Sequence, residues 1–76
     1  MKKQFKIGEY ALGGIIEVVV KKDTVIIDAL DYNTKKSIPF SKAQFDIKYK
    51  NEIDCYLNNL TTCYYSDKIL EYIYKN

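Results

Sequence analysis

The chain contains no histidine, no arginine and no tryptophan, and it has one proline and three glycines among its 76 residues. Without histidine it lacks the side chain that most often transfers protons near neutral pH, which excludes hydrolases of the Ser/His or Cys/His kind. Without arginine it has no guanidinium group to make paired hydrogen bonds with the edge of a guanine base. Sequence-specific DNA binding is therefore disfavoured, and nucleic acid is not expected as a partner. The glycines fit no phosphate-binding loop, so nucleotide hydrolysis is not supported.

Long apolar runs are also missing. The longest uninterrupted run covers residues 18–20, or residues 15–20 if Glu17 is tolerated, whereas a membrane-spanning helix needs about 20 apolar residues. The basic start at residues 1–6 is not followed by the apolar stretch of a secretory signal. We therefore expect a cytoplasmic protein that has no membrane as a partner.

The chain has two cysteines, Cys55 and Cys63. On one helix they would lie about 12 Å apart along the axis, beyond disulfide reach unless a turn brings them together. Two cysteines without histidine make a poor zinc site. We expect two reduced, partly buried thiols, with no metal and no cofactor.

Length and composition predict a single domain over residues 1–76, because the chain is too short for two cores. Apolar residues make up 47% of the chain, which is enough to bury one core. Residues 1–50 are β-rich and residues 51–76 show a helical period. The predicted fold class is α+β, an antiparallel β-meander of four to five strands followed by one or two C-terminal helices packed on one face.

The clearest local signal is a hairpin. Two β-branched runs, residues 15–20 and 25–30, flank a polar turn at residues 21–24. The predicted pairs are Val20 with Val25, Val18 with Ile27, and Ile16 with Ala29. Their side chains form one uninterrupted apolar face, which we expect to be the core.

Three further strands are predicted around this hairpin. Residues 35–40 follow a turn at residues 31–34 and would place Phe40 opposite Val25, with Pro39 restricting this strand to an edge. Residues 4–12 read as a strand with a bulge at Gly8. Residues 44–50 alternate and are a fifth candidate.

From Asn51 the apolar period becomes helical. Asn51 is the expected N-cap, and the predicted buried stripe consists of Ile53, Tyr56, Leu57, Leu60 and Tyr64. A straight helix through residue 75 would have no single buried face, so we expect a break within residues 61–66. Ser66 would then cap a second helix over residues 67–75, although one bent helix is an alternative.

The second face of the hairpin carries an unusual pair of acids. Glu17 and Asp28 stand directly opposite each other, where like charges are normally destabilising. They are flanked by large apolar side chains, and the predicted partner-binding set is Ile15, Glu17, Val19, Ile26, Asp28 and Leu30. Because the helical tail can cover only one face, this face must meet another chain, close into a small barrel or remain exposed.

These features predict a small non-enzymatic protein-binding module with no catalytic residues, for example a regulator or inhibitor such as a bacterial, phage or mobile-element accessory protein. We expect another protein as its partner and self-association into a homodimer. One alternative is a weak single-stranded nucleic-acid binder that uses Lys42, Phe45, Lys48, Tyr49 and Lys50. A second alternative is a small enzyme that uses Glu17 and Asp28 as paired carboxylates.

Overall fold

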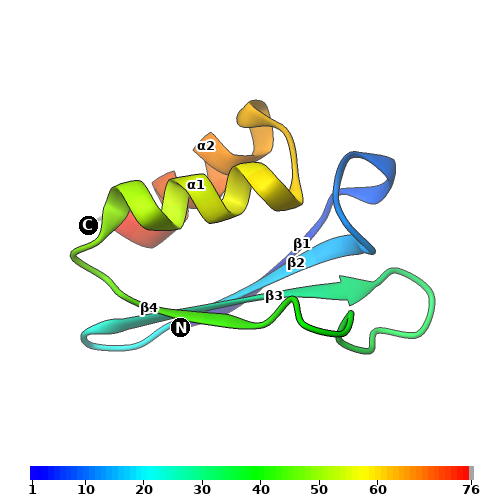
Figure 1. Cartoon of the computed structure of the whole chain (residues 1–76), viewed down its shortest axis with the longest axis horizontal. Helices are drawn as coiled ribbons and strands as arrows, with labels where there is room; N and C mark the ends of the chain where they lie inside the picture. The colour runs from blue at the N-terminus through cyan, green and yellow to red at the C-terminus, as the bar shows by residue number, and fades with distance from the viewer. Residues whose placement is uncertain (76) are drawn as a thin grey trace.

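The computed structural model describes residues 1–75 and shows a four-stranded antiparallel sheet followed by two helices (Figure 1). The elements are β1 (Lys2–Lys6), the 3-10 turn η1 (Gly8–Tyr10), β2 (Gly14–Val20), β3 (Thr24–Asp31), β4 (Ala43–Asp46), α1 (Lys50–Leu60) and α2 (Cys63–Tyr74). The strand order β1-β2-β3-β4 is a simple meander. The predicted α+β class is therefore confirmed.

The central hairpin has the predicted register. Val20 pairs with Val25, Val18 with Ile27, and Ile16 with Ala29. Both helices lie on the face that carries these side chains (Figure 1). The core on this face consists of Ile16, Val18, Val25, Ile27 and Ala29 from the sheet and Ile53, Leu57, Leu60, Ile69, Leu70 and Ile73 from the helices.

The predicted strand over residues 35–40 is wrong. Residues 32–42 form an irregular connection from β3 to β4, and Phe45, not Phe40, pairs with Val25. The connection makes only one isolated bridge to the sheet, between Leu30 and Ser37. A tight turn around Pro39, which has no N–H to donate to a ladder, ends this contact, and the later predicted strand supplies β4.

The predicted strand over residues 4–12 is shorter than expected. It ends at Lys6, and Gly8 begins the 3-10 turn η1 and is not a bulge within a strand. Gly8 has a φ of 78°, a left-handed conformation that glycine adopts without a steric penalty. The chain therefore leaves the sheet before it returns as β2.

The predicted break between the helices is present, but both helices begin earlier than expected. Tyr49, not Asn51, is the N-cap of α1, and Thr62, not Ser66, is the N-cap of α2. Ser66 is fully buried inside α2, where its hydroxyl donates to the Asn58 side chain of α1 at 2.8 Å. The early start of α2 turns Tyr64 outward, so this residue is 61% exposed and not part of the core.

Cys55 and Cys63 are free and exposed, which corrects the expectation of partly buried thiols. No helix within residues 1–75 is both long and apolar enough to cross a membrane. In the same described part of the chain, no group of three or more potential metal-ligating side chains occurs.

Candidate functional site

The predicted partner-binding face is partly covered by the chain itself. Ile15 is 0% exposed and Leu30 is 6% exposed, so neither can supply contact area to a partner. Asp28 is also buried, and Val19 and Ile26 are half-buried. Of the outcomes that the sequence left open for this face, the structure of residues 1–75 shows neither a closed barrel nor a fully exposed patch, and the connection of residues 32–42 bonds Asp28 on this face through Ser37 and Ser41.

The two acids are paired across β2 and β3 as expected, but each has its own hydrogen-bond donors. Glu17 accepts a bond of 2.9 Å from the Gln4 amide and lies 3.6 Å from the Lys2 ammonium. Asp28 accepts bonds from two serine hydroxyls of the connection, Ser37 at 2.7 Å and Ser41 at 2.8 Å. These donors offset the repulsion between the carboxylates and give Asp28 a structural contact that joins the connection to the sheet.

Of the two serines that bond Asp28, Ser41 is the buried one. Its hydroxyl donates to Asp28 and accepts from the Ala29 N–H at 3.1 Å, and its carbonyl accepts from the Tyr56 hydroxyl of α1. Three residues earlier, the Ile38 N–H donates to the Ala29 carbonyl at 2.8 Å. The stretch from Ile38 to Ser41, which we call the Phe40 turn, is therefore held at both ends.

Phe40 lies at the tip of this turn. The Ser41 N–H donates back to the Ile38 carbonyl at 3.1 Å, which closes a four-residue turn with Pro39 at its second position. Phe40, at the third position, has a φ of 66° and a relative exposure of 105%. Glycine is the usual residue for such a φ, and a left-handed backbone costs other residues about 1–2 kcal/mol.

The connection that carries Phe40 is basic. Residues 32–42 contain three lysines, Lys35, Lys36 and Lys42, and no acidic residue. Its start is fixed by Asp31, whose carboxylate accepts the N–H groups of Asn33 at 2.8 Å and Thr34 at 2.9 Å. The bonds from Thr34 and Asn33 hold the pKa of Asp31 below its ordinary value. The exposed Phe40 ring therefore projects from a hydrogen-bonded segment that has lysines both before and after Phe40 in the sequence.

The residues of the predicted nucleic-acid surface are separated in the structure. Phe45 faces the helices and packs against Tyr56, with 5.4 Å between the ring centroids, so its ring is no stacking platform. Lys48, Tyr49 and Lys50 are exposed where the chain enters α1, and Lys42 precedes β4. These residues therefore do not lie together on one strand, because β4 ends at Asp46 and α1 begins at Lys50.

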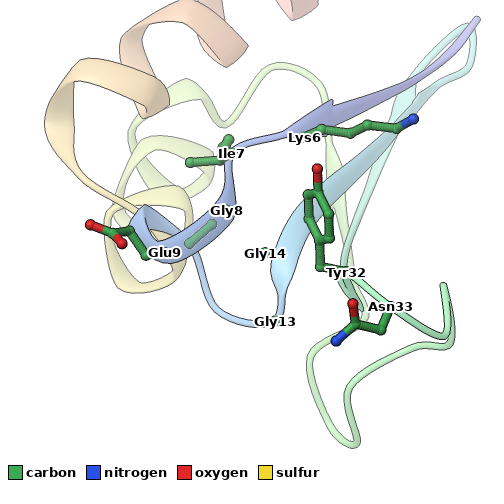
Figure 2. A pocket seen from close by; sticks show the side chains of 9 residues that line it. Lys6, Ile7, Gly8, Glu9, Gly13, Gly14, Tyr32 and Asn33 are labelled. Carbon is green, nitrogen blue, oxygen red and sulfur yellow. The ribbon is translucent and has the colours of Figure 1, made fainter.

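A shallow hollow of about 460 Å³, which the sequence did not indicate, lies beside β2. Figure 2 shows the side chains that line it. It is lined by Lys6, Ile7, Gly8, Glu9, Ala11, Gly13, Gly14, Tyr32 and Asn33. The Tyr32 ring stands beside β2, where a Cβ on Gly14 would come within 2.8 Å of Tyr32. The charged ends of Lys6 and Glu9 point away from each other, so these two groups do not converge on one ligand.

Sequence reasoning did not single out Phe40 as a candidate site residue because it placed the ring in a strand. The Pro-Phe pair is the signal that could have found it, since proline favours the second position of a tight turn. Comparison with known proteins adds no relative: no protein family, no curated protein and no solved structure matches the chain.

Proposed function

We propose that the protein is a small non-enzymatic binding module that occupies the surface of a partner protein through Phe40. The observation that supports this most strongly is the combination of full exposure and a left-handed backbone at Phe40. Either feature alone is unfavourable in water, and strained positions that a fold maintains are concentrated at functional sites. An apolar pocket on a partner gives the ring the burial that its own chain does not supply.

The hydrogen bonds at the base of the Phe40 turn lower the entropy cost of binding through the Phe40 ring. Asp28 and Ala29 of β3 and Tyr56 of α1 hold Ser41, so little backbone freedom is lost when the ring binds. Buried aromatic anchors commonly supply a large share of the binding energy at interfaces. The lysines of residues 32–42 favour a partner whose pocket has acidic residues at its rim.

The test is affinity capture from cells of the organism that encodes the chain, with wild type, Phe40→Ala and Tyr49→Ala as baits. Tyr49 is a matched control because it is an exposed aromatic residue outside the turn. A partner identified by mass spectrometry is then purified and titrated by calorimetry. We expect Phe40→Ala to weaken its binding by at least about tenfold and Tyr49→Ala to leave it unchanged. Equal affinity of wild type and Phe40→Ala for every captured protein would refute the proposal.

A further inference from the structure

A second exposed aromatic surface lies where η1 meets the start of α2. The ring of Tyr10 stacks on Tyr65 with centroids 6.1 Å apart, and Tyr65 meets Tyr64 edge-on at 5.0 Å. Tyr10 is 54% exposed and Tyr64 is 61% exposed. We call these three residues the tyrosine row.

The row is held by contacts between segments far apart in the sequence. The Leu12 N–H donates to the Leu60 carbonyl at 2.8 Å, and the Thr61 hydroxyl donates to the Tyr10 carbonyl at 2.5 Å. A β-bridge between Ala11 and Thr61 completes this junction. Because these contacts fix η1 against the α1–α2 turn, little backbone freedom is lost when the tyrosine row binds.

Apolar surface continues beside the row. Leu12 is 47% exposed and lines a shallow hollow of about 480 Å³ together with Glu9, Tyr10, Ala11, Asn59, Leu60 and Thr62. Tyrosine is enriched at protein interfaces because its ring buries apolar area while its hydroxyl stays hydrogen-bonded. The row and the hollow therefore resemble the centre of an interface.

The row has an acidic side chain near Tyr10 and a basic one on Tyr64. Glu9 is exposed and lines the same hollow as Tyr10, whereas the Lys68 ammonium lies over the Tyr64 ring, 5.1 Å from its centroid. An interface between identical chains related by a two-fold axis is self-complementary, so a row with an acid at one end and a base at the other fits its own antiparallel copy. In such an arrangement each Glu9 would face Lys68 of the other copy, and the two tyrosine rows would lie against each other.

We infer that the tyrosine row, with Glu9 and Lys68 at its ends, is the interface of a two-fold symmetric homodimer. This inference does not depend on the proposed function, because Phe40 lies on a different segment of the chain. It also replaces the second face of the sheet, where Ile15 and Leu30 are buried, as the surface for self-association.

The test is a charge exchange monitored by light scattering over a range of protein concentrations. For wild type we expect the mass to rise from that of one 8.9 kDa chain toward twice that value. Glu9→Lys and Lys68→Glu are each expected to weaken the dimer by at least about fivefold, and the double variant is expected to restore it. Tyr64→Ala is expected to weaken it by at least about tenfold, with Tyr49→Ala as the unaffected control.

A wild-type chain that stays monomeric at the highest concentration would overturn the inference. So would a dimer that survives Tyr64→Ala and both single charge reversals, because it would use another surface. All of the changed residues are exposed or half-exposed at the surface, and circular dichroism of each variant verifies that it is folded. Phe40→Ala should dimerise like wild type, so failure here is distinguishable from failure of partner binding.

Discussion

Within residues 1–75, Phe40 has no packing contact that accounts for its identity. Its side chain is fully exposed, and its backbone has the φ of a glycine position. The turn keeps this conformation because Ser41 and Ile38 on its two sides are hydrogen-bonded to β3. The strain is therefore compensated by neighbouring bonds that do not involve the Phe ring, and the ring can be exchanged without loss of packing.

This separation predicts that Phe40→Gly stabilises the fold while it removes the anchor. Glycine relieves the left-handed strain of about 1–2 kcal/mol but loses more backbone entropy, so we expect a net gain of up to about 1 kcal/mol in the free energy of unfolding. Urea denaturation measures the change. Lys42→Gly is the control, because it removes an exposed side chain outside the turn and should be destabilising. A clear loss of stability in Phe40→Gly would mean that the ring packs on its own chain.

At the scale of secondary-structure elements, patterns within one hairpin were predictable. The β2–β3 register follows from two β-branched runs and the short turn between them, because a shift by one residue would move every apolar side chain to the other face. The opposite placement of Glu17 and Asp28 follows from the same register. These features depend only on residues that are close in the sequence.

The partner of β3 on its other side was not predictable by the same reasoning. Ile38 and Phe40 alternate as well as Phe45 and Ile47 do, so alternation alone does not decide which segment pairs with β3. The structure selects the later segment, while the Asp28 carboxylate holds Ser37 and Ser41 of the earlier one. A serine in a segment without a regular apolar period gives no local sign that it will bond a buried acid, so the sequence did not reveal that Phe40 is exposed.

The helices are joined to the connecting segments through two tyrosine hydroxyls. Tyr56 of α1 donates to the Ser41 carbonyl, and Tyr74 of α2 donates to the Ile47 carbonyl at 2.7 Å. Burial, and to a lesser extent the charge of Asp28, raises the pKa of Tyr56, and burial raises the pKa of Tyr74. Both contacts therefore depend on protonated phenols.

The predicted consequence is a loss of stability in alkali. A phenol whose pKa is raised by folding contributes stability that is fully present below its unfolded pKa of about 10 and lost as the pH rises through the higher folded value. We expect the free energy of unfolding to fall above about pH 10, and to fall less steeply in Tyr56→Phe. Tyr56→Phe should also cost about 1 kcal/mol at neutral pH through its lost hydrogen bond.

Chemical denaturation at a series of pH values measures this dependence. Tyr49→Phe is the matched control, since Tyr49 is exposed and its substitution should leave the alkaline slope as in wild type. Identical slopes in wild type and Tyr56→Phe would contradict a contribution of the Tyr56 phenol.

At the scale of the whole molecule, both helices within residues 1–75 cover one face of the sheet (Figure 1), and the connection of residues 32–42 bonds Asp28 on the other face. The sequence predicted large apolar side chains on both faces, and both faces do carry them. It did not show that Ile15 and Leu30 would be buried by the chain itself, because that burial depends on the path of a connection with no regular period. The uncovered remainder, around Val19 and Ile26, is half-buried among polar neighbours.

Substitutions of two adjacent isoleucines of β3 test whether the closely packed core lies on one face of the sheet. Ile27 is fully buried beneath the helices, whereas Ile26 points to the second face and is half-buried. We expect Ile27→Ala to cost about 3 kcal/mol, a large part of the roughly 4 to 11 kcal/mol expected for a chain of 76 residues. Ile26→Ala should cost about 1 kcal/mol. Denaturant unfolding at low protein concentration measures both values on the monomer. Equal losses at the two positions would mean that the second face is as closely packed as the first, which a sheet covered by helices on one side does not allow.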